Sequence, residues 1–283
     1  MIPAHTIDIF TFYDEHPLNA AEVMSRLEES GADLDNLAPE ALFAHDQDHY
    51  GGTQATDALV APLALGAGTE VLDVCSGLGG TCRYLAHRFG CRVMGVDLNH
   101  SRVAGAEELT RLVGLEDRVR CIPADATDMP FAEGLVPEGH FDVALGQEAF
   151  LHIPDKAALF ANIHRALRVG GKLAFTDWIA FPTLNADERD AMRRTIVAQN
   201  ITGLEEYHQL VEAAGFHAIQ AEDLSTPWKE ILRARLEMFR NMEGGTVKRF
   251  GEKRHAEFIA AYVLFVNLIS EGKLGGVRMH ARK

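Results

Sequence analysis

The middle of the chain alternates between two hydrophobic patterns. Short apolar runs at 70–74, 92–97, 119–122, 141–146 and 172–178 have the length and composition of buried strands. Between several of them, apolar residues recur every three or four positions, as on one face of a helix. Strands that alternate with helices in this way predict parallel βαβ units. The fold class is therefore α/β, with helices on both faces of the sheet.

The N-terminal part of the chain is polar and helical in pattern. Asn19 precedes Glu22 by three residues, and Gly31 follows the apolar positions, which predicts a helix between them. A second short helix is expected at 39–43. A loop rich in charged residues and histidine is expected at 45–52.

The C-terminal part combines helices with two further strands. Thr202 and Glu205 have the spacing of a capping box, which predicts the start of a helix. Beyond this helix, the pattern predicts a strand at 216–221, mostly helical structure at 227–271 and a last strand at 275–281.

The chain is long and acidic. Its 283 residues give a prior of roughly two domains. The 41 acidic and 27 basic side chains give a formal net charge of −14, and 47% of the residues are apolar, enough for a large core. Such an excess of negative charge argues against a nucleic acid, a polyanion or a membrane surface as partner. The charge does not by itself identify a substrate.

Targeting and membrane signals are not evident in the sequence. The first residues lack a basic segment followed by an apolar one, so no secretory signal is expected. The longest apolar stretch, 258–269, is interrupted by Asn267 and is shorter than the roughly 20 residues that span a bilayer, which predicts a buried helix. The four cysteines form no CxxC pair, so neither a zinc site nor a disulfide framework is expected. We therefore expect a cytoplasmic protein with reduced thiols.

A glycine-rich turn follows the first predicted strand and opens a helix. It runs from Asp73 to Gly80, and Gly77 and Gly79 let a ligand approach the main chain closely. A dinucleotide-binding fingerprint would place its third glycine at Cys82. This single mismatch keeps a nicotinamide cofactor as an alternative. A phosphate-binding GK[ST] loop is absent.

Three acidic residues at or near predicted strand ends indicate which ligand the glycine-rich turn could bind. Asp97 ends the second predicted strand, where a carboxylate can accept both hydroxyls of a ribose. Asp125 follows the third strand, where it can accept from an adenine amino group. Asp73 precedes the glycines, where its charge would repel a pyrophosphate but suit a cation. Ribose, adenine and a cationic tail together describe S-adenosylmethionine.

Several segments resemble class I S-adenosylmethionine-dependent methyltransferases. They are residues 71–80, 95–99, 125–126 and 167–173. Residues 147–153 and 175–178 are similar to segments of the sarcosine/dimethylglycine and phosphoethanolamine N-methyltransferase groups, whose fourth strand ends in a similar acid-x-x-Leu-His segment. The resemblance covers residues 46–216.

The resemblance implies a Rossmann-like sheet of seven strands in the order 3-2-1-4-5-7-6, with the last strand antiparallel, under a discontinuous helical lid. It divides the chain into an N-terminal lid segment, 1–68, and a methyltransferase core, 69–283, with lid insertions at about 183–205 and 224–271. S-adenosylmethionine is the implied cofactor and S-adenosylhomocysteine its product. The implied cofactor-binding residues are Tyr50, Asp73, Ser76, Gly77, Gly79, Asp97, Leu98, Asp125, Ala126 and Gln147.

Methyl transfer from a sulfonium needs an in-line nucleophile in a water-poor site, and an amine nucleophile must arrive deprotonated. His152, just after the fourth strand, is the candidate base; the alternative is that it packs or positions the lid. The residues considered for substrate contact are Tyr13, Tyr50, His152, Trp178 and Tyr207, with ordinary packing favoured for Tyr13 and also for Trp228. The arginines considered for a substrate carboxylate are Arg83, Arg193 and Arg194.

We therefore expect an enzyme that transfers a methyl group from S-adenosylmethionine to a small molecule, most readily at an amine nitrogen. Alternatives are methylation of carbon, oxygen or thioether sulfur. A nicotinamide-dependent oxidoreductase and a non-catalytic cofactor-binding module are the alternatives of other classes. No metal is expected, although His45 and His49 flank two acidic residues. A homodimer is compatible with the sequence.

Overall fold

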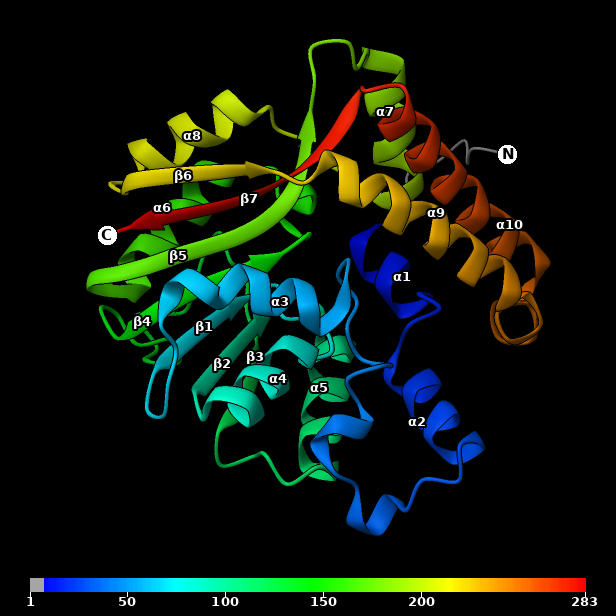
Figure 1. The fold of residues 1–283 in the computed structure, drawn as a ribbon, viewed down its shortest axis with the longest axis horizontal. Coiled ribbons are helices and arrows are strands. Elements are labelled where there is room, and N and C mark those ends of the chain that lie inside the picture. The colour runs from blue at the N-terminus through cyan, green and yellow to red at the C-terminus, as the bar shows by residue number, and fades with distance from the viewer. Residues whose placement is uncertain (1–7) are drawn as a thin grey trace.

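The computed structural model describes residues 8–283, so the first seven residues of the predicted segment 1–68 lie outside the described part. The centre of the molecule is a seven-stranded sheet in the order β3-β2-β1-β4-β5-β7-β6 (Figure 1). Strands β1 to β5 are parallel, and β7 runs antiparallel to both β5 and β6. The expected strand order and the antiparallel last strand are confirmed. The strands are β1 Glu70–Val74, β2 Arg92–Asp97, β3 Val119–Pro123, β4 Phe141–Gln147, β5 Leu167–Ala180, β6 His217–Asp223 and β7 Leu274–Arg282.

Helices cover both faces of this sheet because successive strand residues point to opposite sides. In β1, Val71 packs with α3, α4 and α5, whereas Leu72 packs with α6 and α8 on the other face. The two faces therefore have separate apolar clusters, and both residues are fully buried. The helices are α3 Gly52–Val60, α4 Gly80–Phe89, α5 His100–Leu112, α6 Lys156–Ala166 and α8 Leu204–Ala213.

Four helices gather beyond the carboxyl ends of the strands (Figure 1). We call them the helical cap: α1 Ile9–Asp14, α7 Ala186–Ile196, α9 Ser225–Asn241 and α10 Glu243–Ser270. They share one apolar cluster, in which Phe12, Trp228 and Phe258 are buried together with Trp178 of β5. Segments from both ends of the chain thus meet over one edge of the sheet.

The remaining N-terminal elements agree with the pattern of the sequence. Helix α2, Ala20–Glu29, begins where predicted, because the side chain of Asn19 accepts a hydrogen bond of 3.0 Å from the backbone N of Glu22. Gly31 follows it with a positive φ of 72°. Short 3-10 turns complete the element set: Leu34–Asn36, Pro39–Ala41, Ala61–Leu63 and Phe150–His152.

Two boundaries differ from the predicted ones. The capping box at Thr202 and Glu205 is wrong, because Gly203 is the N-cap of α8 and makes no side-chain cap hydrogen bond. A reciprocal capping box forms instead at Asn185 and Glu188, at the start of α7. Strand β5 also begins earlier than expected, directly after the last residue of α6.

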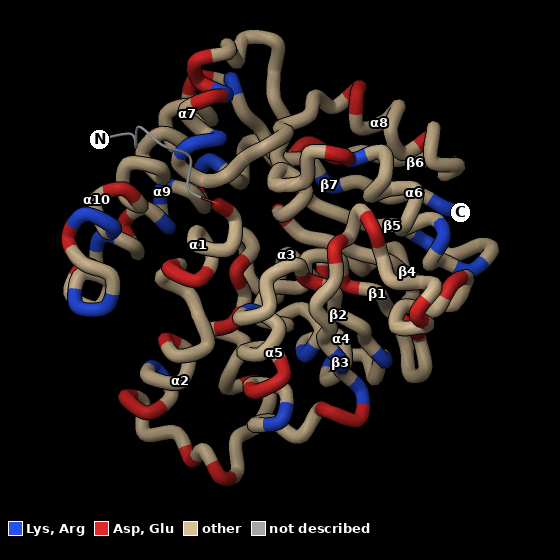
Figure 2. Tube along the Cα trace, turned by 180° about the vertical axis from the view of Figure 1, so that it is seen from behind, with Lys and Arg blue, Asp and Glu red and all other residues tan. Residues whose placement is uncertain are grey.

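Charged residues are distributed around the described part of the molecule (Figure 2), and the longest apolar stretch is packed inside it. Asp and Glu positions are scattered over the helices and loops around the whole molecule (Figure 2). The apolar stretch 258–269 lies in α10 and packs its aromatic residues against the rest of the cap, as expected for a buried helix. Within residues 8–283, no helix has the length and apolar content to cross a bilayer.

Candidate active site

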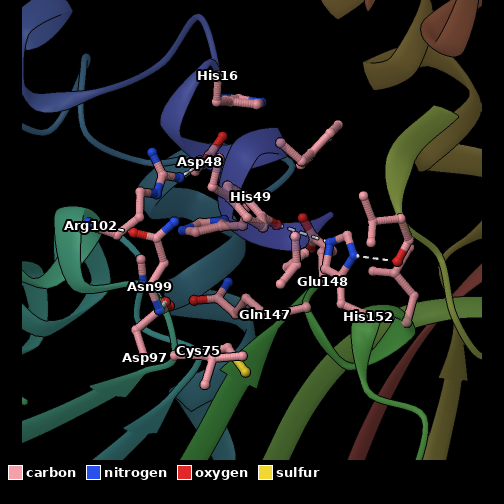
Figure 3. A pocket seen from close by; sticks show the side chains of 18 of the residues that line it. His16, Asp48, His49, Cys75, Asp97, Asn99, Arg102, Gln147, Glu148 and His152 are labelled. Carbon is pink, nitrogen blue, oxygen red and sulfur yellow. Dashed lines mark hydrogen bonds and ion pairs between the residues drawn. The ribbon is translucent and has the colours of Figure 1, made fainter. Parts of the chain in front are cut away.

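The carboxyl ends of β1, β2 and β4 and the helical cap enclose a cavity of about 730 Å³. In α/β sheets, ligands bind at the carboxyl edge where the strand order reverses, which here is between β1 and β4. Figure 3 shows Cys75, Asp97 and Gln147 on the strand side of this cavity, with His16 and Asp48 on the side of the cap.

The glycine-rich turn forms part of the cavity wall. Gly77 has a φ of 52°, a conformation that favours glycine, and its backbone N donates to Oδ2 of Asp97 at 2.8 Å. The backbone N of Asn99 donates to Oδ1 at 2.9 Å, so Asp97 is held from both sides. Burial raises the pKa of this carboxyl, and the neighbouring backbone donors only partly offset that effect.

The other glycines of the turn have packing roles. Gly79 does not line the cavity; a Cβ there would lie 3.1 Å from Cβ of Ala106 on α5. The absence of a side chain at Gly79 therefore allows α5 to approach the turn, and its contact with the cofactor stays a prediction. At Gly80, a Cβ would lie 2.2 Å from the backbone O of Asp46. The loop 45–51 thus passes directly over the turn.

Asp73 is a buried carboxyl without a cationic partner among the described residues. Its side chain lines the cavity, is 3% exposed and accepts from Sγ of Cys82 at 3.1 Å. Burial raises the pKa of Asp73 to about 7. A cation bound in the cavity would stabilise the ionised carboxylate at this position.

The region after β2 and β3 provides the second end of the cavity. Leu98, Asp125 and Thr127 line it, and the side chain of Leu98 is unusually exposed for leucine, at 42%. Ala126 does not line the cavity: it is buried in the core, and its carbonyl accepts from Asn162 at 3.2 Å. The side chain of Ala126 thus packs in the core, and the predicted contact of this residue with the adenine stays a prediction.

Gln147, the last residue of β4, offers an unsatisfied donor. Its Oε1 accepts from the hydroxyls of Thr81 at 3.0 Å and Thr56 at 3.3 Å. These two bonds fix the orientation of the amide. Nε2 is buried and has no hydrogen-bond partner among the described residues. Because a buried amide donor without a partner is unfavourable, Nε2 fits a ligand acceptor in the cavity.

His152 forms a pair with a tyrosine of the cap. Its Nδ1 lies 3.1 Å from the carbonyl O of Val197, and its Nε2 lies 2.9 Å from the hydroxyl of Tyr13. A carbonyl only accepts, so Nδ1 carries the hydrogen and Nε2 accepts from Tyr13. Burial lowers the pKa of His152 to about 4. The imidazole is therefore neutral near pH 7, with the lone pair of Nε2 directed at Tyr13.

Aromatic residues form the wall next to this pair. Trp178 stacks on Phe265 with ring centres 4.6 Å apart, and its edge meets Tyr50 at 5.6 Å. All three line the cavity together with Tyr262 of α10. Trp228 lies behind Tyr50, outside the cavity lining, which agrees with its predicted packing role.

Tyr207 does not belong to this wall, so its predicted substrate contact is corrected. Its ring packs in the core on the α6 and α8 face of the sheet, and it is fully buried. Its hydroxyl donates to the carboxylate of Asp177. The apolar face of α8 predicts burial of Tyr207 but not the cluster in which it is buried.

The arginines and histidines that the sequence suggested also lie elsewhere. Arg83 is buried in an ion pair of 2.8 Å with Asp46, which ties the loop 45–51 to α4. Arg193 and Arg194 pair with Asp190 along α7. None of the three lines the cavity. Within residues 8–283, no group of acidic, histidine or cysteine side chains is arranged to hold a metal.

Among the cavity residues that the sequence analysis did not select are three charged ones: Arg102, Glu148 and Arg235. Glu148 has a φ of 53°, and its carboxyl accepts from the backbone N of Tyr50 and from the hydroxyl of Thr176. Burial raises the pKa of Glu148 to about 8. The signal for Glu148 was its place as the acid of the acid-x-x-Leu-His segment. The helical patterns around Arg102 and Arg235 do not show which cavity they border.

Comparison with known proteins identifies the family. A methyltransferase-domain family matches residues 72–175. Methyltransferase GfsG of Streptomyces halstedii is 32% identical over 211 residues, which cover 68% of this chain and 73% of GfsG. The chain belongs to the class I S-adenosylmethionine-dependent methyltransferases.

Other methyltransferases in the comparison differ in length and named substrate. Phosphoethanolamine N-methyltransferase 1 of Triticum aestivum is 33% identical over 200 residues, covering 71% of this chain and 39% of the relative. The chain thus spans less than half the length of the plant methyltransferases it matches. The 27-O-demethylrifamycin SV methyltransferase of Amycolatopsis mediterranei is 29% identical over 234 residues, covering 82% of this chain and 83% of the relative.

A solved structure shares the fold of this methyltransferase. Haemonchus contortus phosphoethanolamine N-methyltransferase 2, in complex with S-adenosyl-L-methionine, has a TM-score of 0.76 at 22% identity, covering 99% of this chain and 61% of the other. The cofactor of the family, S-adenosylmethionine, fits the cavity described here. The unpartnered donor of Gln147 and the buried carboxyl of Asp73 are suited to its polar and cationic groups.

Proposed function

We propose that this methyltransferase transfers a methyl group from S-adenosylmethionine to a hydroxyl group on a largely apolar small molecule. The bound cofactor supplies a methyl group on a sulfonium leaving group, which needs no acid to assist its departure. The chain must therefore hold the acceptor in line, remove its proton and exclude water. We further propose that the helical cap acts as the lid over this reaction.

The cofactor half of the cavity would be held by the residues that its chemistry needs. The carboxylate of Asp97 suits the ribose hydroxyls, and the region of Leu98 and Asp125 suits the adenine. Asp73 and Gln147 suit the cationic and acceptor groups of the methionine part. Further residues expected to contact the cofactor are Tyr50, Ser76 and Gly77, all of which line the cavity.

The observation that carries the proposal is the hydrogen bond of 2.9 Å between Tyr13 and neutral His152 at the cavity wall. An acceptor hydroxyl that donates to the Tyr13 oxygen can lose its proton to that oxygen while the Tyr13 proton moves to Nε2 of His152. Positioned general bases of this kind contribute about 10²–10⁴-fold to rates. The Val197 carbonyl holds the imidazole in the tautomer that this transfer requires.

The lining of the cavity supports an apolar acceptor. Phe12, Trp178, Phe258 and Phe265 lie on the cap side, and the only cations that line the cavity among the described residues are Arg102 and Arg235. Arg102 is already paired with Asp48. A relative that covers most of this chain is named for a demethylated oxygen of rifamycin, which supports a hydroxyl acceptor.

An amine nitrogen is the second candidate acceptor. The rings of Tyr50, Trp178 and Tyr262 and the carboxyl of Glu148 line the cavity. Aromatic faces suit an amine and its cationic product, and the carboxyl oxygens of Glu148 can accept a hydrogen bond from the amine. The phosphoethanolamine N-methyltransferase relatives support the same atom, which is also the one favoured by the sequence analysis.

Methyl transfer from cofactor labelled in the methyl group, offered with a panel of apolar alcohols, phenols, amines and thioethers, tests the proposal. We expect labelled oxygen methyl ethers; labelled N-methyl products would establish the second candidate. Label on carbon or sulfur alone, or no label on any acceptor, would overturn both.

A thermal melt distinguishes a methyltransferase from a nicotinamide-dependent oxidoreductase. S-adenosylhomocysteine at ~100 times its Kd should add about 2.7 kcal/mol of stability, and NAD should add none.

A further inference from the structure

Arg235 is a cavity cation without an acidic partner. It lies on α9, and its side chain lines the cavity. Its Nη1 donates to the backbone O of Asp48 at 2.8 Å, and its guanidinium carbon lies 5.0 Å from the centre of the Tyr50 ring. No carboxylate in residues 8–283 lies within ion-pair distance of Arg235. Tyr262 also interacts with the guanidinium, but a backbone carbonyl, a phenol and an aromatic face do not neutralise its charge.

Three well-buried arginines of the described chain are arranged differently. Arg83 pairs with Asp46 at 2.8 Å, Arg254 pairs with Glu15 at 3.0 Å, and Arg102 pairs with Asp48. Charges withdrawn from water are normally paired, because an unpaired one is costly. Arg235 is only partly buried, yet it lines a ligand cavity without such an ion pair, which indicates that an anion from a ligand completes it.

Neither of the neighbouring carboxyls forms an ion pair with Arg235. The carboxylate of Asp48 is paired with Arg102, and that of Glu148 accepts from the backbone N of Tyr50 and from Thr176. Because burial raises the pKa of Glu148 to about 8, this group is largely uncharged near pH 7. Arg235 therefore interacts with Asp48 and Glu148 only at longer range, and no carboxylate of the described residues makes an ion-pair contact with it.

The surroundings of Arg235 define the rest of the ligand. Tyr262, Phe258 and Phe265 of α10 line the same cavity and belong to the aromatic cluster of the cap. These residues offer apolar contacts but no further cation. The ligand that satisfies both features has one anionic group on an apolar body.

We propose that Arg235 binds a carboxylate of the methyl acceptor, so that the substrate is an apolar organic acid carrying the hydroxyl to be methylated. This inference rests on the proposed function. A carboxylate suits the planar fork of the guanidinium, which can donate two parallel hydrogen bonds to it. The proposal also assigns Arg235 the role for which the sequence suggested Arg83, Arg193 or Arg194.

Binding to the full chain saturated with S-adenosylhomocysteine tests this without any turnover. The probes are 10-hydroxydecanoate and 4-(4-hydroxyphenyl)butanoate, each compared by calorimetry with its neutral methyl ester. We expect at least one acid to bind tenfold or more tightly than its ester. Arg235→Ala should lose at least tenfold for that acid and little for the ester, and Arg235→Lys should lose less. Arg233→Ala is the matched control, since Arg233 lies on the same helix and is half-exposed beside Glu230.

Equal binding of acids and esters, or binding of neither acid, would overturn the proposal. A second comparison separates the carboxylate of the cofactor from that of the acceptor. 5′-Methylthioadenosine lacks the amino-acid part of S-adenosylhomocysteine. If Arg235 binds the acceptor and not the cofactor, Arg235→Ala should leave the ratio of the affinities for these two compounds unchanged. A tenfold loss for S-adenosylhomocysteine alone would assign the anion to the cofactor and overturn the acceptor assignment. Because no methyl is transferred, failure here is distinct from failure of the proposed activity.

Discussion

The hydroxyl of Tyr13 lies 2.9 Å from Nε2 of His152, although 139 positions separate the two residues in the sequence. Tyr13 belongs to α1, close to the N-terminus, and His152 follows β4. Their contact places a helix of the cap directly against the strand end where the methyl acceptor is expected. The guanidinium of Arg102 lies 5.0 Å from the centre of the Tyr13 ring and supports its position.

The pair should act as a unit in catalysis. We expect Tyr13→Phe and His152→Gln each to lower kcat by about 10²–10⁴-fold, the range of general-base effects, because either change interrupts proton transfer from the acceptor. The double variant should be little slower than the slower single variant, since residues that act as a unit are not additive. Single-turnover rates and calorimetry with S-adenosylhomocysteine would check this, with cofactor Kd values expected within about threefold of the wild type. Losses under tenfold in both single variants would remove the base role from His152.

Glu148 should make the stability of the ligand-free protein depend on pH. Burial raises its pKa in the folded state to about 8, above the ordinary value of 4.5, so between these pH values the folded state holds a proton that the unfolded chain has released. Stability contributed by this protonated group is therefore lost as pH rises from about 5 to 8. We expect Glu148→Gln to make the fall of Tm over this range shallower than in the wild type. Glu230→Gln, at an exposed carboxylate on α9, should leave it unchanged, and equal slopes in all three proteins would contradict the prediction.

Tyr207 should matter for stability rather than for the reaction. Removing its hydroxyl by Tyr207→Phe leaves the buried carboxyl of Asp177 without that donor, which costs about 1–3 kcal/mol. We expect a lower denaturant midpoint together with an unchanged KM for the acceptor. A raised KM with unchanged stability would instead restore the substrate contact that the sequence suggested.

The cofactor side of the cavity could be predicted because its residues stand next to strand ends. In a parallel sheet these ends meet at one edge, so Asp73, Asp97 and Asp125 are brought together by the order of the strands alone. The sequence predicts less accurately which single residue near a strand end faces the cavity. Gly79 and Ala126 each lie one or two residues from a cavity residue, and the exact course of a turn decides which side chain faces the ligand.

The acceptor side could not be predicted in the same way. A hydrophobic pattern shows that a helix has a buried face, but not which other helix covers that face. Tyr207 and Tyr262 both lie on buried helix faces, yet one packs in the core and the other borders the cavity. Arg235 gave no signal, because the contact of α9 with the loop 45–51 arises only in the folded chain, and the acid-x-x-Leu-His segment contained Glu148 without showing that it borders the cavity.

The close passage of the loop 45–51 over the glycine-rich turn should make Gly80 intolerant of a side chain. A Cβ at this position would lie 2.2 Å from the backbone O of Asp46, and a main-chain atom cannot rotate away as a side chain can. Gly80→Ala must therefore displace the loop, at a cost of about 1–3 kcal/mol for overpacking. Because the loop also carries Tyr50, the affinity for S-adenosylhomocysteine should fall as well. Gly245→Ala is the control: a Cβ there meets no atom within 4 Å, so stability and affinity should stay at wild-type values. Wild-type affinity in Gly80→Ala, measured by calorimetry alongside denaturant unfolding, would show that the position of the loop does not control cofactor binding.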